Sequence, residues 1–379
     1  MDYRRAYTLQ CINNQSSLGA ARSTNGHPAK EGRTTMLVTR QKVFRRFWYP
    51  VIPMDQLADG PKPFTLLGEK IVLWLDADGK PAAMIDRCGH RTAKLSCGFV
   101  ENGHLVCGYH GWTYDRVGNC VRVPQAKDPA RTGNFKLDAY RCVERYGYAW
   151  VALEDPLIDI PAIPEADDPT FRRIPQFYEE WRCAGLRLME NSFDAAHQPF
   201  VHRTSFGDIN RPQPFDWNID EHAWGFHAVS QSEVVNRDIS KQVLRIDADR
   251  TTRTRNSAWW LPFNRRLGII YPNGLNHVLI TCATPIDDER SMIVQFVFRN
   301  DTETQVPTQA VIAFDRQVTF EDKFILESTD PDVPLDSSGE RNMPSDKPGL
   351  IMRRKLLDLL QAHGETEVRR TGANLLRNS

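Results

Sequence analysis

The sequence has no excess of charge of either sign and no long run of purely apolar residues. Lysine and arginine together number 48, and so do aspartate and glutamate, in a chain of 379 residues. A charge-balanced chain has no overall attraction for nucleic acid or for an anionic membrane, so we expect neither as a partner. With 41% hydrophobic and 25% charged residues, the composition is that of a folded protein with room for two domains of about 100–200 residues.

The longest uncharged run, residues 267–286, does not predict a membrane helix. It reaches the length of about 20 residues that a membrane span needs, but it contains Pro272, Asn273 and Gly274. Asn-Gly between two β-prone stretches is a strong hairpin signal. The sequence therefore predicts two strands joined by a turn here, and no membrane span.

Residues 1–35 lack both a hydrophobic period and the apolar core of a secretory signal. We expect a disordered extension of a cytoplasmic protein, with an organelle transit peptide as the less favoured alternative and Met36 as a possible start. Without a secretory signal, the eight cysteines are expected to be reduced or metal-bound rather than paired in disulfides.

The rest of the chain divides into two patterns. Residues 43–155 show short β-like runs separated by turns, which predicts a small antiparallel β domain. A segment rich in proline and acidic residues, 155–175, predicts a linker. Residues 156–379 combine strand-like stretches within 226–297 with helices expected at 186–197, 308–328 and 349–363. This pattern predicts an α+β fold, with a catalytic domain built around a central antiparallel sheet.

Two short boxes supply a first set of metal ligands. Cys88 and His90 are followed, after sixteen residues, by Cys107 and His110. A tetrahedral zinc site is the obvious competitor, but structural zinc sites usually draw their ligands as Cys-Cys and His-His pairs. Here each box supplies one cysteine and one histidine. A Rieske [2Fe-2S] cluster needs this arrangement, because two cysteines hold one iron and two histidines hold the other.

A second set of ligands begins about ninety residues later, with Asn191, Asp194, His197 and His202. The first three residues are spaced three positions apart, so we expect them near one face of a helix. Pro199 is expected to break that helix and let His202 turn toward the same site. Two histidines and one carboxylate form the facial triad of mononuclear Fe(II) oxygenases, so a carboxylate is missing.

The helix expected at 308–328 offers that carboxylate. Its apolar stripe runs through Val311, Phe314, Val318 and Ile325. Asp322 falls in the stripe, where a carboxylate is costly unless it is paired or binds a metal. We therefore expect Asp322 to be the third ligand, with Asp315 and Glu321 as alternatives.

At these residues the sequence resembles the Rieske non-haem iron oxygenases, from Phe44 to about Pro331. Within that family it most resembles the branch of methylxanthine N-demethylases and of dicamba and vanillate O-demethylases. The motifs that carry the resemblance are Cys88-x-His90, Cys107-x2-His110-Gly111-Trp112, Asn191-x2-Asp194-x2-His197-x4-His202 and Phe320-Glu321-Asp322-Lys323.

The resemblance implies a Rieske domain and a helix-grip-like catalytic domain. It implies that His197, His202 and Asp322 hold Fe(II), and that Asp194, with Asn191 beside it, serves catalysis. Asp194 would bridge toward His90 or His110 of a neighbouring subunit in a homotrimer.

The implied reaction is insertion of one oxygen atom from O2 into a C–H bond of a small aromatic or heterocyclic substrate, by hydroxylation or by oxidative N- or O-demethylation. Electrons would come from NAD(P)H through a separate reductase of flavin or ferredoxin type, since no Gly-x-Gly-x-x-Gly follows a strand in this chain. The alternative is a non-catalytic Rieske electron-transfer or redox-sensing protein. Candidate pocket residues are Phe206, Trp217, Phe226, Trp259, Trp260, Phe263 and Phe296, although aromatics at strand spacing often belong to the core.

Overall fold

The computed structural model describes residues 38–128, 132, 135–337 and 340–368. The predicted disordered extension, residues 1–35, lies outside them. The described chain divides into a first compact unit, residues 52–153, and a second unit that joins residues 38–51 to residues 154–368. No helix among the described residues is long and apolar enough to cross a membrane.

Two antiparallel sheets build the first unit. The larger has the strand order β1-β10-β9-β4-β3-β2, and the smaller has the order β5-β6-β7-β8. The elements are β1 (Tyr49–Pro53), η2 (Met54–Asp59), β2 (Lys62–Leu66), β3 (Glu69–Leu75), β4 (Pro81–Ile85), η3 (Leu95–Cys97), β5 (Phe99–Glu101), β6 (His104–Val106), β7 (Thr113–Tyr114), β8 (Cys120–Arg122), β9 (Ala139–Arg145) and β10 (Tyr148–Ala152). The predicted short strands of residues 43–155 are thus present.

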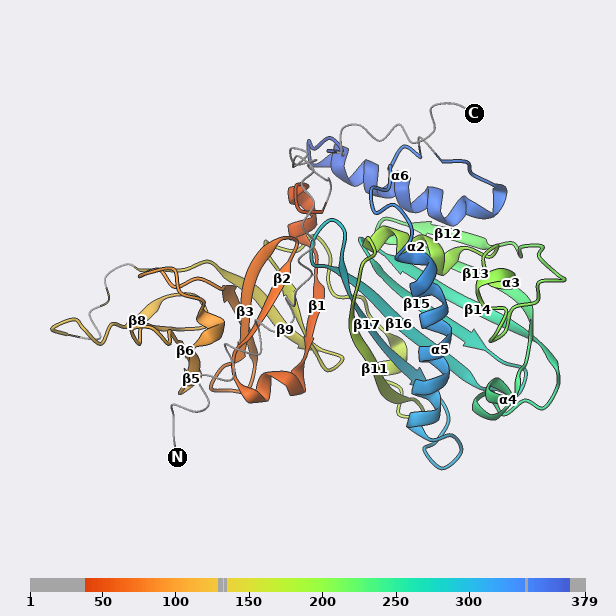
Figure 1. The fold of residues 1–379 in the computed structure, drawn as a ribbon, viewed down its shortest axis with the longest axis horizontal. Coiled ribbons are helices and arrows are strands. Elements are labelled where there is room, and N and C mark those ends of the chain that lie inside the picture. The colour runs from red at the N-terminus through yellow and green to blue at the C-terminus, as the bar shows by residue number, and fades with distance from the viewer. Residues whose placement is uncertain (1–37, 129–131, 133–134, 338–339, 369–379) are drawn as a thin grey trace, which may run out of the picture. The chain divides into compact units, whose positions relative to one another are not determined.

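One seven-stranded antiparallel sheet forms the centre of the second unit, in the order β11-β17-β16-β15-β14-β13-β12. The long helix α5 runs across one face of this sheet (Figure 1). The strands are β11 (Arg172–Trp181), β12 (Asn218–His222), β13 (Gly225–Val235), β14 (Arg250–Trp260), β15 (Asn264–Ile270), β16 (Asn276–Pro285) and β17 (Ser291–Arg299). The helices are η1 (Lys42–Arg46), η4 (Pro164–Ala166), α2 (Gly185–Phe193), α3 (Gln198–Val201), α4 (Asp238–Leu244), α5 (Thr308–Leu326), η5 (Pro344–Asp346) and α6 (Lys347–Ala362). The predicted α+β fold class is confirmed.

The hairpin predicted at Asn273-Gly274 joins β15 to β16. Ile270 pairs with Asn276 across the turn, and Gly274 has a φ of 82°. That left-handed conformation suits glycine because it has no Cβ. The uncharged run of residues 267–286 is therefore a strand pair inside the sheet.

Two expectations about the sequence pattern are wrong. The segment predicted as a linker already contains the start of β11, where Pro175 is tolerated because β11 is an edge strand. The region 226–297 consists largely of strands, as predicted, with the short helix α4 between β13 and β14. The apolar stripe of α5 ends at Leu326, which is 4% exposed, rather than at Ile325, which is 42% exposed.

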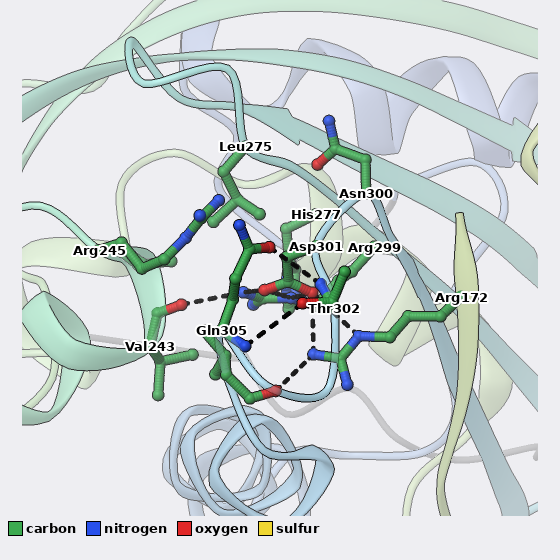
Figure 2. A network of polar contacts seen from close by, with 12 residues as sticks. Arg172, Val243, Arg245, Leu275, His277, Arg299, Asn300, Asp301, Thr302 and Gln305 are labelled. Carbon is green, nitrogen blue, oxygen red and sulfur yellow. Dashed lines mark hydrogen bonds and ion pairs between the residues drawn. The ribbon is translucent and has the colours of Figure 1, made fainter. Parts of the chain in front are cut away.

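A buried ion-pair network ties β17 to its surroundings (Figure 2). Arg299 and Asp301 have fully buried side chains, and their closest N···O distance is 2.5 Å. Arg172 of β11 pairs with the same carboxylate at 2.8 Å. Arg299 also donates to the carbonyl oxygen of Val243 at 2.9 Å and to Nδ1 of His277 at 2.9 Å. Asp301 therefore pairs with two arginines, and Glu303 gives Arg172 a second carboxylate partner at 2.6 Å.

Replacing Asp301 with alanine is expected to lower the free energy of unfolding by about 3–5 kcal/mol, because the fully buried Arg299 loses its carboxylate partner. Urea denaturation of the purified protein measures this change. Asp249→Ala, which breaks an exposed pair with Lys241, serves as the control and should leave the midpoint unchanged. Equal midpoints for both variants would contradict the assigned role of the network.

Candidate metal centres

The first predicted ligand set lies on two tight loops of the first unit. In the loop after β4, the backbone N–H of Thr92 donates to the carbonyl oxygen of Cys88, and that of Cys88 donates to Ala93. In the loop after β6, Gly111 donates to Cys107 and Cys107 donates to Trp112. Each loop thus closes on itself and holds one cysteine and one histidine at fixed spacing.

The cysteines of this set face the core and the histidines face outward. Cys88 and Cys107 are 2% and 1% exposed, whereas His90 and His110 are partly exposed. A hydrogen bond with Cys107 lowers the pKa of the Cys88 thiol, and the hydroxyl of Tyr114, 3.3 Å from its sulfur, acts in the same direction. The same hydrogen bond, together with burial, raises the pKa of Cys107. Without a metal, the pair therefore favours one thiolate, the form that binds metal, and one thiol.

The two imidazoles are held side by side. Their ring centroids lie 4.5 Å apart, and His90 stacks on Trp112 with an interplanar angle of 3°. The buried Nδ1 atom of His90 has no hydrogen-bond partner. The site thus offers two thiols in the core and two adjacent imidazoles at its edge, and the ring nitrogen of one imidazole has no partner. This combination fits the donor set of a Rieske cluster.

The second predicted set converges on one point in the second unit. The Nε2 atoms of His197 and His202 are 3.2 Å apart. Asp322 Oδ1 lies 3.6 Å from the first nitrogen and 3.2 Å from the second. These three residues meet as a possible metal-binding group, with all their ligand atoms within 4.8 Å of one another.

Two further carboxylates fix which ring nitrogens face this point. Asp194 Oδ2 lies 3.0 Å from Nδ1 of His197, and Glu321 Oε2 lies 2.8 Å from Nδ1 of His202. If both imidazoles donate these protons, both Nε2 atoms present lone pairs. Sequence reasoning offered Glu321 only as an alternative ligand, and the structure places it behind His202 instead.

The electrostatics of the second set favour an ionised carboxylate. Burial by itself would raise the pKa of Asp322, but the adjacent imidazole of His202, then His197 and Asn191, hold that pKa below its usual value. Although burial opposes it, contact with Asp322 and Glu321 raises the pKa of His202. In the absence of a metal, the imidazole and the carboxylate therefore stabilise each other's charged forms.

The donor set fits a mononuclear metal ion. Asp322 Oδ1 is buried and makes no hydrogen bond of acceptable geometry, despite its closeness to both imidazoles. Metal–nitrogen bonds of about 2.1 Å at right angles place neighbouring ligand atoms about 3 Å apart. The observed separations of 3.2–3.6 Å are close to this value. Two histidines and one carboxylate are the donor set of non-haem Fe(II) sites.

The chain reaches this geometry by a path that differs from the predicted one. Helix α2 ends at Phe193, and Asp194 is extended, with φ −78° and ψ 130°. Its carboxylate accepts the backbone N–H groups of Ala196 at 2.7 Å and His197 at 3.1 Å, and this competes with helix continuation. Pro199 does not break a helix. It lies in the first turn of α3, where its missing N–H costs nothing.

Asp315, the other alternative ligand, contacts residues outside the predicted iron site. Its Oδ1 atom lies 3.1 Å from Nε2 of His277, and its other oxygen accepts from Gln176. It is absent from the group formed by His197, His202 and Asp322. Asp315 is therefore a polar residue of the cavity wall.

A cavity opens beside the second site, between α5 and the sheet. Its cavity volume is about 90 Å³. Asn191 lines it together with the three predicted ligands.

Of the aromatic residues predicted to line the substrate pocket, only Phe206 lines this cavity. Phe226, Trp259, Phe263 and Phe296 are core residues, Trp217 packs against Phe193 and Phe215, and Trp260 lines a separate hollow.

Sequence reasoning missed three arginines in the cavity wall, Arg253, Arg255 and Arg265. Burial, then the charge of Arg253, lowers the pKa of Arg255 well below its usual value. Burial lowers the pKa of Arg265 to about 10. The alternation of Arg253 and Arg255 within a predicted strand was the available signal, because it places both charges on one face.

Comparison with known proteins identifies two matching domain families. A Rieske [2Fe-2S] domain matches residues 47–143, and a vanillate O-demethylase oxygenase C-terminal domain matches residues 181–362.

Two relatives with assigned activities match the chain. It is 30% identical over 335 residues to the methylxanthine N1-demethylase NdmA of Pseudomonas putida, covering 86% of this chain and 92% of that protein. It is 35% identical over 165 residues to the dicamba O-demethylase oxygenase component of Stenotrophomonas maltophilia, covering 42% of this chain and 48% of that protein.

Solved structures of such proteins are also similar to this chain. Pseudomonas putida NdmA with caffeine has a TM-score of 0.73 at 28% identity, covering 90% of this chain and all of that one. Dicamba monooxygenase bound to dicamba has the same TM-score, covering 84% of this chain and 98% of that one; at 22% identity it supports the fold alone.

Glu321→Gln is expected to weaken Fe(II) binding at the second site by about 10–100-fold, because His202 loses the charged partner that orients its ring. Competition with a ferrous chelator measures the affinity, while the visible spectrum reports on the cluster separately. Glu327→Gln, an exposed change near the end of the same helix, is the matched control. Equal Fe(II) affinity in the two variants would argue against this role for Glu321.

Proposed function

Because this chain belongs to the Rieske non-haem iron oxygenases, we propose that His197, His202 and Asp322 hold its catalytic iron. The chain is an oxidoreductase of the monooxygenase and demethylase type, and it carries a Rieske [2Fe-2S] cluster and a mononuclear iron. The observation that carries the residue assignment is the convergence of these three side chains, with ligand atoms within 4.8 Å of one another. In this assignment residues 43–155 form the Rieske domain and residues 156–379 the catalytic domain.

Cys88, His90, Cys107 and His110 hold the cluster in this proposal. The buried cysteines anchor it in the core, and the partly exposed histidines present its outer edge. When bound by these residues, the cluster would supply single electrons and the mononuclear Fe(II) would supply O2 activation; one oxygen atom would enter a C–H bond of the substrate, and two electrons and two protons would reduce the other to water.

The chain's own residues prepare the site for this reaction. Asp194 and Glu321 keep a proton on Nδ1 of each histidine, so that each Nε2 lone pair remains directed at the iron. Asn191 lines the same cavity as Asp322 and helps to keep the pKa of that carboxyl low, which supports its ionised form. The helix and sheet around the cavity limit the entry of water next to the substrate.

The substrate is a small organic molecule that is hydroxylated or demethylated. The relatives are named for methylxanthines and dicamba. When the oxidised carbon is an N- or O-methyl group, the oxygenated product breaks down to formaldehyde and the demethylated compound. A purely electron-transferring Rieske protein does not need a second unit with a complete set of iron ligands, so the catalytic function is favoured.

Oxygenase components of this kind work with separate reductase or ferredoxin partners. We propose further that the functional form is a homotrimer in which Asp194 carries electrons between subunits. The Asp194 side chain is 29% exposed although it contacts His197, so a histidine of a neighbouring subunit can reach it. A carboxylate held between two metal-bound imidazoles orients both and completes an electron path.

The iron assignment predicts a difference in metal content. Anaerobically purified protein should contain about three irons and two acid-labile sulfides per chain, and His197→Ala should lose one iron with the Rieske spectrum unchanged. Iron analysis with visible and EPR spectra measures this. His363→Ala, at an exposed histidine of the same unit, should keep all three irons. Two irons in both the parent and His197→Ala would overturn the mononuclear site.

The trimer assignment predicts complementation between two inactive variants. Asp194→Asn keeps its cluster but loses the bridge, and Cys88→Ser loses its cluster but keeps the bridge. Co-expressed chains of the two kinds should recover measurable turnover, because electrons cross from one subunit to the next. Each variant alone, with intact mononuclear iron, should lack turnover. If co-expression of the two kinds restores none, transfer between subunits is ruled out.

A further inference from the structure

Two arginines reach the cavity from neighbouring inward positions of β14. Arg253 and Arg255 are two residues apart, so both side chains leave the same face of the strand, and both line the cavity. Only 6% of Arg253 and 3% of Arg255 is exposed. Two positive charges therefore lie in a space that water reaches poorly.

Neither guanidinium has a carboxylate partner among the described residues. The contact of Arg253 is with the ring of Phe206, 4.6 Å from the ring centroid. Arg255 donates to the amide oxygen of Gln198 at 2.8 Å and lies over the ring of Phe215. The Nε atom of each arginine is buried without a hydrogen-bond partner.

The carboxylates that do line the cavity are already engaged. Asp322 faces the two histidines of the iron site. Asp315 accepts from Gln176 and lies beside His277. Both arginines therefore remain without a counter-charge within this cavity wall.

A buried cation without a counter-charge is costly, and the cost falls when an anion enters the site. The planar guanidinium matches a carboxylate well, because two parallel N–H groups can bind its two oxygens. Arg299 lies on the same sheet and shows the contrast, since Asp301 neutralises it permanently (Figure 2). Arg253 and Arg255 lack such a partner, which marks them as groups that a ligand completes.

Apolar side chains of three elements also line the cavity, next to polar residues and a third arginine, Arg265. Leu267 and Ile269 of β15, Leu279 of β16 and Val318 of α5 line the space together with the two arginines. Arg255 is the cross-strand neighbour of Ile269, so the charged and apolar surfaces are continuous. A ligand that fits this wall has an apolar body and one anionic end.

We propose that the substrate of this oxygenase is a small organic anion whose carboxylate binds between Arg253 and Arg255 and whose apolar body extends toward the iron ligands. The proposal rests on the proposed function and adds the chemical class of the substrate. Within it, Arg253 and Arg255 select the substrate by charge.

The test compares two ligands of nearly the same shape, 4-methoxybenzoate and 4-methoxybenzamide. Their binding to the anaerobic holoenzyme is measured by calorimetry, without reductase. The benzoate is expected to bind at least about tenfold more tightly than the amide. Arg255→Gln is expected to remove most of this preference and to leave the affinity for the amide unchanged. Arg182→Gln removes the same charge at an exposed position of the second unit and should keep the preference.

Three outcomes overturn the proposal: equal affinity of the parent protein for the two ligands, preference for the amide, or no complex with the benzoate. A preference that persists unchanged in Arg255→Gln also overturns the assignment to that residue. Folding of the variant is checked from its cluster spectrum. Iron content measured on the same samples separates this test from the proposed function, because a missing third iron contradicts the oxygenase assignment whichever ligand binds.

Discussion

The catalytic unit depends on holding three electron-pair donors together inside a protein. The Nε2 atoms of His197 and His202 and Oδ1 of Asp322 lie 3.2–3.6 Å from one another. Lone pairs directed at one point repel each other unless a cation lies between them, so the arrangement needs both a metal and a rigid support. Asp194 and Glu321 supply the support by binding the far nitrogen of each ring. The end of α2 at Phe193 follows from the same requirement, because the Asp194 carboxylate also caps the turn that presents His197.

The central sheet contains buried arginines in two different environments. Arg299 is fully paired with Asp301, which fixes β17 and leaves no charge for a ligand. Arg253 and Arg255, on β14, are as buried but have no anionic partner among the described residues. The first arrangement stabilises the fold, whereas the second reserves binding energy for a ligand. A single sheet face thus combines a structural network with a cavity that is lined by two arginines without a carboxylate partner among the described residues.

The Rieske unit has a different requirement, because its cofactor must be anchored in the protein and must also accept electrons from outside the chain. Its two loops bury Cys88 and Cys107 in the core and leave His90 and His110 partly exposed. The stacked Trp112 holds the ring of His90 in place. In the proposed assignment, the cysteines anchor the cluster and the histidines give access to it.

The sequence alone was enough to predict the α+β class and the hairpin at Gly274, and it proposed both ligand sets, because each depends on residue types at short, fixed spacing. Asp322 was predictable since a carboxylate in an apolar stripe needs a partner. The sequence did not reveal that Asp194 ends α2, that Glu321 supports His202, or that Arg253 and Arg255 face the cavity without counter-charges. These features depend on which residues from distant elements meet, such as β14 with α3 and α3 with α5. Only the folded chain decides such contacts, because burial and pairing are properties of three-dimensional neighbours and not of local spacing.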